Sequence, residues 1–256
     1  MTNKFSTEEY QIHGDIFQKQ YLAADNVVRY YKNQAELTLE EWNREINLFQ
    51  SMSVLENHPN FLIRFKENHR RNSFLKLVDP TSNDIIADVG CETGYLSEKL
   101  VKECKKLYCI DIDENLLSLA RERIGANRAE FIQSDIQEIQ LEDNSVDIAI
   151  GAEILEHLPD PTIGLKELMR ITRPNGKVLI SVPNEPFILF IKKVLRTFGM
   201  SFLLRGLSPK LAIGHVHIFK RKKAREMCRG LARIEKLYYN PPFYLNIFAQ
   251  LRVKSE

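Results

Sequence analysis

Apolar and polar positions along the chain follow a regular alternation from residue 84 onward. The predicted strands are the short apolar runs at 85–89, 106–110, 129–132, 146–150 and 177–182. The predicted helices are the amphipathic stretches near 94–103, 114–123 and 161–172. Strands that alternate with helices are typical of a parallel sheet with helices on both faces, so this part is expected to be a doubly wound α/β core.

The pattern differs on either side of this core. Residues 1–80 are predicted to be helical, because TLEEWNREINLFQSMSVLE begins with a capping box from Thr38 to Glu41 and continues with helical spacing. NFLIRFKENHRRNSFLKLV is a second helical candidate. After Pro186, an apolar and basic insertion precedes two strand-like runs, ARIEKLYY and FYLNIFAQLRV. These runs are expected to close the sheet as an antiparallel pair at one edge.

The 256 residues fit one large domain with a lid. The predicted fold class is α/β: a doubly wound seven-stranded sheet with an N-terminal helical region and a helical insertion after the fifth strand. The predicted parts are an N-terminal helical lid (1–80), a ligand-binding core (81–185), a basic amphipathic lid insertion (186–230) and the closing strands (231–256).

The loop within IIADVGCETGYLSEKL, residues 85–100, indicates the kind of ligand. Asp88 ends the strand and only Gly90 and Gly94 follow, whereas a dinucleotide loop has the pattern G-x-G-x-x-G. A carboxylate at this place suits a cation better than a pyrophosphate. S-adenosylmethionine carries an ammonium and a sulfonium, and glycines let the backbone approach its methionine part. S-adenosyl-L-methionine is therefore the favoured cofactor.

Acids at the ends of the following strands extend this pattern. Asp111 ends the second strand, where a carboxylate can accept hydrogen bonds from both ribose hydroxyls. Asp135 follows the third strand and can accept from the adenine amino group. Glu153 and His157 follow the fourth strand and are expected to face the cleft.

Each of these residues also has a purely structural interpretation. The glycine loop alone is compatible with a tight strand–helix turn. Asp111 can serve as a helix N-cap, although Asp113 is the better candidate. Asp135 can be a turn acid, and the acid and histidine after the fourth strand can form local hydrogen bonds at a helix start.

Five segments in order resemble the class I S-adenosylmethionine-dependent methyltransferases: DVGCETG, IDIDENLL, SDIQEI…DNSVDIAI, EILEHLPDP and RITRPNGKVLISVPN. The similarity is greatest to the small-molecule branch that includes quinone, lipid and glycan tailoring enzymes. It covers roughly residues 80–185 and, in strand pattern, 230–253. It implies a Rossmann-like fold, an S-adenosylmethionine-binding core at 81–185 and a methyltransferase activity of EC 2.1.1 type.

The resemblance also implies roles for individual residues. Asp111 matches the family's ribose acid, Ile112 its neighbour that packs on adenine, and Asp135 the adenine-contacting acid. Ala152 and Glu153 match positions that line the methionine end. The expected cofactor-binding residues are Asp88, Gly90, Cys91, Glu92, Gly94, Asp111, Ile112, Asp135, Ile136, Ala152 and Glu153.

The first motif of the family usually reads D/E-x-G-x-G-x-G. Asp88, Gly90 and Gly94 match it, and Glu92 replaces the middle glycine. This replacement is tolerable if residue 92 needs no positive φ and its side chain points away or toward the ligand's ammonium. The alternatives are weaker cofactor binding, or a binding or regulatory protein that has lost catalysis.

The candidate catalytic bases are His157, His215 and His217, because an imidazole can take a proton near neutral pH. The last two alternate in GHVHIF and point the same way if the segment is extended. The expected reaction transfers a methyl group to an oxygen, with carbon or nitrogen less favoured, of a small or carrier-linked lipid, glycan or natural product. Neither the histidines nor the four cysteines show metal-ligand spacing, so no metal is expected.

Charge is distributed unevenly along the chain. The net charge is only +2, but residues 190–236 hold 13 Lys and Arg against 2 Asp and Glu. This basic segment can be a solvated surface, attract an anionic acceptor, or contact an anionic membrane peripherally. An RNA methyltransferase is an alternative by charge alone, but no aromatic platform accompanies it, so nucleic acid is not an expected partner.

The chain shows no signal-peptide pattern and no run of 18 apolar residues. A cytoplasmic protein, with membrane association as an alternative, is therefore expected.

NPPF, at 240–243, resembles the Asn-Pro-Pro-aromatic motif of enzymes that methylate nucleic-acid amino groups. It lies between the last two strands rather than after the fourth, so a turn is predicted there. The oligomeric state is not predicted.

Overall fold

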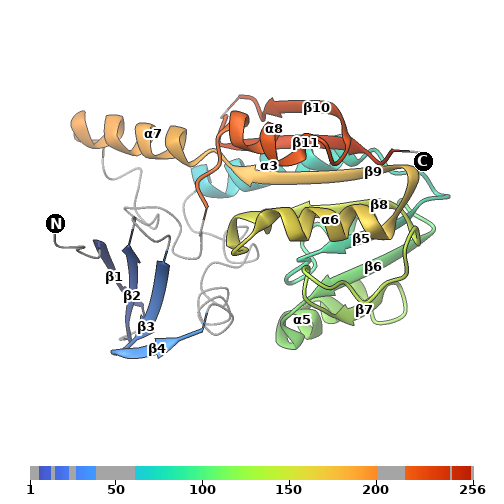
Figure 1. The fold of residues 1–256 in the computed structure, drawn as a ribbon, viewed down its shortest axis with the longest axis horizontal. Coiled ribbons are helices and arrows are strands. Elements are labelled where there is room, and N and C mark those ends of the chain that lie inside the picture. The colour runs from blue at the N-terminus through green and yellow to red at the C-terminus, as the bar shows by residue number, and fades with distance from the viewer. Residues whose placement is uncertain are drawn as a thin grey trace.

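The computed structural model describes residues 6–12, 15–22, 27–38, 61–200, 217–242 and 244–254. Its large sheet has seven strands in the order β10-β11-β9-β8-β5-β6-β7 (Figure 1). The strands are β5 (Ile85–Val89), β6 (Lys106–Asp111), β7 (Glu130–Gln133), β8 (Val146–Ala152), β9 (Thr172–Pro183), β10 (Arg233–Tyr239) and β11 (Asn246–Arg252). Strands β5 to β9 pair in parallel, and β11 pairs antiparallel with both β9 and β10. The predicted doubly wound sheet and its antiparallel edge are confirmed.

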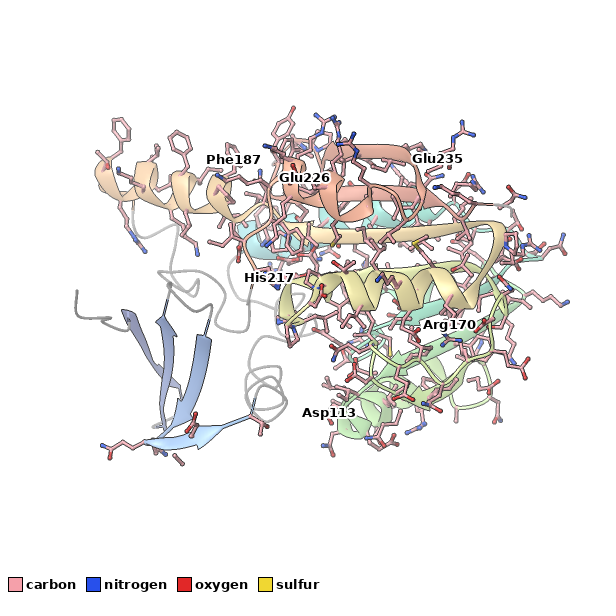
Figure 2. All side chains as sticks on the ribbon, viewed as in Figure 1. Asp113, Arg170, Phe187, His217, Glu226 and Glu235 are labelled. Atoms are coloured by element: carbon pink, nitrogen blue, oxygen red, sulfur yellow. The ribbon has the colours of Figure 1, made fainter. Side chains whose placement is uncertain are left out.

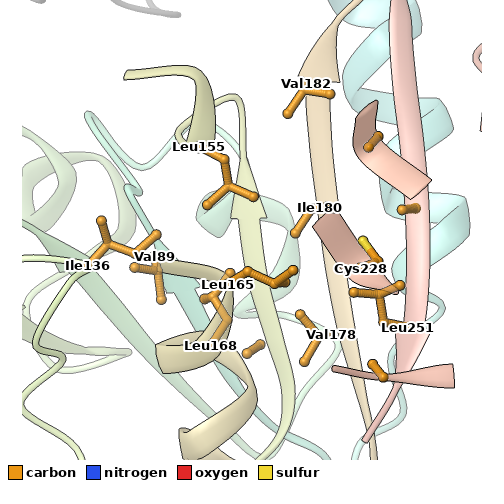
Figure 3. Close-up of a cluster of buried hydrophobic side chains, with 14 of the residues drawn as sticks. Val89, Ile136, Leu155, Leu165, Leu168, Val178, Ile180, Val182, Cys228 and Leu251 are labelled. Atoms are coloured by element: carbon orange, nitrogen blue, oxygen red, sulfur yellow. The ribbon is translucent and has the colours of Figure 1, made fainter. Parts of the chain in front are cut away.

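Helices cover both faces of this sheet. They are α3 (Phe61–Val78), α4 (Ser97–Leu100), α5 (Glu114–Ile124), α6 (Pro161–Ile171), α7 (Glu185–Thr197) and α8 (Arg221–Cys228), with a 3-10 turn, η1, at Leu155–His157. Alternate residues of β5 enter opposite core clusters: Ile86 packs with residues of α3 and α5, whereas Val89 packs with residues of α6. Figure 3 shows the second cluster, in which Leu165 and Leu168 meet Val178 of β9.

The N-terminal segment differs from its prediction. Residues 6–37 form a four-stranded antiparallel sheet, β1 (Ser6–Ile12), β2 (Asp15–Leu22), β3 (Val27–Lys32) and β4 (Ala35–Leu37), so the helical prediction is wrong there. The sequence VVRYYK of β3 consists largely of β-branched and aromatic residues, which favour strands. Asn33 and Gln34 both have positive φ, as the two-residue turn of a β-hairpin requires.

The sequence predicts two particular helices within residues 1–80. The helix expected from the capping box at Thr38 lies, beyond that residue, outside the described part of the chain. The second candidate is confirmed as α3.

Smaller differences occur inside the core. The helix predicted near 94–103 is only the single turn α4, because Gly94 has a φ of +74° and the chain tightens after Leu100 into three-residue turns. The predicted insertion helices are present as α7 and α8, and residues 201–216 between them are not described. Among the described helices, none combines the length and apolar character needed to cross a bilayer.

Candidate active site

A cavity of about 670 Å³ lies at the carboxyl ends of β5, β6 and β8. The strand order reverses direction at β5, and ligands of doubly wound folds bind at such a switch point. The predicted site residues that line the cavity are Asp88, Gly90, Cys91, Glu92, Asp111, Ile112, Asp135, Ile136, Ala152, Glu153 and His157. Gly94 is not among the lining residues and packs against α5 instead.

Gly90 begins the loop that forms the floor of the cavity. Its φ is +74°, and its N–H donates to the Ile110 carbonyl of β6 at 2.8 Å. The N–H of Cys91 donates to the same oxygen at 3.0 Å. A Cβ on Gly90 would lie 2.4 Å from Cδ1 of Ile154. Both the backbone conformation and the lack of space therefore require glycine here.

Glu92 adopts the left-handed conformation that the family's middle glycine would adopt freely. Its φ is +48°, so the condition that residue 92 needs no positive φ is not met. Its N–H donates to Oδ2 of Asp111 at 2.9 Å, which fixes the loop in this conformation. A non-glycine residue held there costs about 1–2 kcal/mol.

The strain at Glu92 predicts an order of stability among substitutions. Glu92→Ala keeps the strain and Glu92→Gly removes it, so the glycine variant is expected to be more stable than the alanine variant by about 1 kcal/mol, measured by urea unfolding. Gly199 and its φ of +70° provide the reverse control, since Gly199→Ala introduces the same strain. Equal stability of the two Glu92 variants would show that the loop relaxes around residue 92.

Asp111 presents a carboxylate that two backbone donors hold in place. Oδ1 accepts from the N–H of Asp113 at 3.0 Å, and Oδ2 accepts from the N–H of Glu92. Burial raises the pKa of this carboxyl, while these hydrogen bonds act in the opposite direction. The N-cap of α5 is Asp113, which accepts from the N–H of Asn115 at 2.9 Å. The capping function thus belongs to Asp113, and Asp111 faces the cavity.

Two neighbouring residues complete this end of the cavity. Ile112 is 43% exposed although it is apolar, and it lines the cavity wall, where it offers a surface for a flat ring. Asp135 accepts from the N–H of Gln137 at 2.8 Å. Asp135 therefore stabilises a turn through this hydrogen bond and also lines the cavity.

Asp88 lies beneath the loop and is 2% exposed. Burial raises the pKa of its carboxyl to about 6, and the nearby Asp111 adds to this effect. The hydroxyl of Ser97 donates to Oδ2 at 2.5 Å and acts in the opposite direction. A cation bound beside Asp88 would relieve the cost of its buried charge.

Glu153 is held by residues from distant elements. Its Oε1 accepts from the Ser181 hydroxyl at 2.6 Å, and its Oε2 accepts from Nδ2 of Asn246 at 2.9 Å. Nη1 of Arg70, from α3, lies 3.7 Å from Oε2. These contacts of Glu153 are with distant segments rather than with a neighbouring helix start. They fix its carboxylate at the cavity wall.

Helix α3 contributes residues that the sequence interpretation missed: Arg70, Arg71 and Phe74 line the cavity. The Cζ atom of Arg71 lies 4.0 Å from the ring centroid of Tyr95. Although burial lowers the pKa of Arg70, the carboxylates of Glu67 and Glu153 raise it above its ordinary value. The adjacent arginines and the phenylalanine one turn later were a visible signal, but spacing alone does not show which face of a helix meets the sheet edge.

The three candidate histidines have different surroundings. His157 lines the cavity. His217 does not: its Nε2 donates to the Pro159 carbonyl at 2.9 Å and its Nδ1 accepts from Nζ of Lys223 at 3.2 Å. Burial also lowers the pKa of His217, so its contacts suit a structural role. His215 lies outside the described residues.

The described residues of the NPPF segment, 240–242, belong to the predicted turn between β10 and β11. The N–H of Asn240 donates to the Asn246 carbonyl at 2.9 Å, and its own carbonyl accepts from the N–H of Tyr244 at 2.7 Å. Asn240 is absent from the cavity lining. Within the described residues, no group of His, Cys, Asp and Glu could hold a metal ion.

Known methyltransferases are similar to this chain in sequence. Residues 87–180 match the family described as methyltransferase domain. A demethylmenaquinone methyltransferase of Bacillus mycoides (strain KBAB4) is 26% identical over 171 residues, which cover 61% of this chain and 72% of the relative. A malonyl-[acyl-carrier protein] O-methyltransferase of Serratia marcescens is 32% identical over 96 residues, 38% of this chain and 37% of the relative.

A solved structure agrees in fold. N-methyltransferase NodS from Bradyrhizobium japonicum WM9, in complex with S-adenosyl-L-homocysteine, superimposes with a TM-score of 0.57 at 16% identity, covering 82% of this chain and 100% of NodS. The matched segment contains the loop from Asp88 to Gly94, Asp111 and Asp135, which the fold brings to one edge of the sheet. Residues 87–180 are thus a methyltransferase domain, the chain as a whole is similar to S-adenosylmethionine-dependent methyltransferases, and its cofactor is S-adenosyl-L-methionine.

Proposed function

We propose that the enzyme transfers the methyl group to an oxygen atom of a small or carrier-linked acceptor. The observation that carries this proposal is the lining of the cavity, which combines the acids at the ends of β5 and β6 with Tyr95 and His157. The acids suit the cofactor, and Tyr95 and His157 are available to an acceptor. S-adenosyl-L-methionine supplies an activated methyl group on a sulfonium, so the protein needs mainly to align the acceptor and exclude water, effects worth about 7–11 kcal/mol.

The polar groups of the cavity match the cofactor part by part. Asp111 suits the ribose hydroxyls, Asp135 suits the adenine amino group, and Ile112 offers an apolar surface to the ring. Asp88 and the glycine loop suit the ammonium end. The cofactor also carries a carboxylate, and Arg71 offers it a cation on the α3 side of the cavity, next to Arg70.

His157 is the proposed base for a hydroxyl acceptor, because it is the candidate histidine that the described residues place on the cavity wall. A positioned base contributes roughly 10²–10⁴-fold to such a step. His157→Gln is therefore expected to lower kcat by about a hundredfold and to leave the Kd for S-adenosylhomocysteine unchanged. A kcat that stays within twofold would remove His157 from the chemistry.

The acceptor class is supported by the relatives and by charge. Two relatives are named for a demethylated quinone and for an acid on acyl carrier protein. The basic segment after β9 suits an acceptor with an anionic carrier. The proposal is tested by an S-adenosylhomocysteine-release assay over hydroquinones, carboxylic acids on acyl carrier protein, and polyprenyl-phosphate-linked sugars. An oxygen-methylated product identified by NMR supports it, and a product methylated only at nitrogen or carbon contradicts it.

The buried Asp88 predicts how cofactor binding depends on pH. Because burial raises the pKa of its carboxyl to about 6, the carboxylate that attracts the cationic cofactor is lost as the pH falls through 6. The Kd for S-adenosylmethionine is expected to rise about tenfold between pH 7 and pH 5, a window below the titration of α-amino groups. Calorimetry measures this change.

The matched control is Asp88→Asn, in which the affinity should be lower but nearly constant across the same window. A pH dependence that persists unchanged in this variant would assign the effect to another carboxyl, such as Asp111.

A further inference from the structure

Helix α7 exposes an aromatic face. In Figure 1 it extends from the end of β9 past the edge of the large sheet. Phe187 (labelled in Figure 2), Phe190, Val194 and Phe198 recur at helical spacing on one side. Phe190 is 60% exposed and Phe198 is 73% exposed, and in the described part of the chain Glu185 is the only buried residue of α7. A soluble protein rarely leaves such a row of aromatic side chains uncovered without a use for it.

The opposite side of α7 is cationic. Lys192 and Arg196 are one turn apart on it, and Lys193 is exposed at its flank. Burial lowers the pKa of Lys192, the neighbouring cations Arg196 and Lys66 lower it further, and Glu185 acts in the opposite direction. A helix with phenylalanines on one face and lysines and arginines on the other has the composition of helices that lie in a membrane interface.

A groove joins this helix to the start of α8. Phe187 and Phe190 stack with their ring centroids 6.3 Å apart. Together with Tyr239, Tyr244 and Lys220, they line a groove of about 530 Å³. Lys220 precedes the exposed basic residues of α8. Aromatic rings beside a lysine suit the boundary between lipid headgroups and acyl chains.

We propose that the aromatic face of α7, with Lys193 and the Lys220 groove beside it, docks on an anionic lipid bilayer. The charge of the segment favours this partner, because residues 190–236 carry 13 cations against 2 anions, and anionic lipids attract such a segment. Docking would place the enzyme beside membrane-held acceptors, and that consequence alone rests on the proposed function. The binding itself does not depend on methyl transfer.

The test is sedimentation of the full chain with vesicles of phosphatidylcholine alone or with added phosphatidylglycerol, without cofactor. Wild type should bind the anionic vesicles at least tenfold more tightly than the neutral ones. Phe190→Ser/Phe198→Ser and Lys193→Glu/Lys220→Glu should each weaken binding to anionic vesicles at least tenfold. The controls Leu119→Ser/Ile163→Ser and Lys102→Glu/Lys105→Glu make matched changes on exposed residues elsewhere and should stay within twofold.

Titration of every variant with S-adenosylhomocysteine separates docking from the cofactor site and verifies folding. Unchanged cofactor affinity with lost vesicle binding supports the proposal, even if no acceptor is ever methylated. Equal binding to neutral and anionic vesicles, no vesicle binding by wild type, or equal losses in the control variants would overturn it. The proposal would also be overturned if wild type did not bind vesicles but formed a concentration-dependent dimer that Phe190→Ser/Phe198→Ser abolishes. The aromatic face would then be the contact with a second copy of the chain.

Discussion

Replacing Asp111 with alanine is expected to weaken S-adenosylmethionine binding at least a hundredfold. The carboxylate accepts from the backbone N–H groups of Asp113 and Glu92, so its loss frees the loop that forms the cavity floor. The same carboxylate is the proposed acceptor for the ribose hydroxyls. Hydrogen bonds to a charged group contribute about 1.5–3 kcal/mol each. Losing the two bonds to the ribose hydroxyls therefore costs at least about 3 kcal/mol, which raises the Kd at least about a hundredfold.

Calorimetric titration of wild type and Asp111→Ala measures this effect. Glu114→Ala is a suitable control, because Glu114 also lines the cavity but pairs outward with Arg121 on α5. Thermal unfolding verifies that both variants are folded. A Kd for Asp111→Ala within fivefold of wild type would contradict the role assigned to this carboxylate.

Gly94→Ala is expected to destabilise the fold by about 2–5 kcal/mol. Gly94 has a φ of +74°, and an added Cβ would lie 2.8 Å from Cδ1 of Ile124 and 3.3 Å from the Cα of Ala120. The backbone term costs about 1–2 kcal/mol, and crowding against helix α5 costs about 1–3 kcal/mol more. Urea unfolding measures the change.

Gly230→Ala separates these two contributions. Gly230 has a φ of +86°, and no described atom lies within 4 Å of the position of an added Cβ. This variant should lose only the backbone term, about 1–2 kcal/mol. Equal losses for Gly94→Ala and Gly230→Ala would mean that the packing of Gly94 against α5 contributes nothing.

The core could be predicted from the sequence because its signals are local. The strands are short apolar runs, and the acids proposed to bind the cofactor lie at strand ends, as Asp88 and Asp111 do. In a parallel sheet these ends meet at one edge, so the spacing along the chain already places the side chains together. The match of residues 87–180 to the methyltransferase domain agrees with that reasoning.

The parts that sequence reasoning missed depend on contacts between distant segments. Arg70 meets Glu153 although 83 residues separate them, and Asn246 meets Glu153 from the far end of the chain. The conformation of Glu92 follows from its bond to Asp111, which no local pattern encodes. The N-terminal sheet has a local signal in VVRYYK, whereas the helical prediction for residues 1–80 rests on the amphipathic pattern after Thr38.

The most direct test of the central claim is a calorimetric titration of the purified wild-type chain with S-adenosylmethionine and with S-adenosylhomocysteine. We expect one site per chain with micromolar affinity for both, because Asp111 already holds the Glu92 loop in a single conformation. Absence of binding to either compound at millimolar concentration, by a chain shown to be folded, would contradict it. Glu92 would then block the site that the surrounding acids outline.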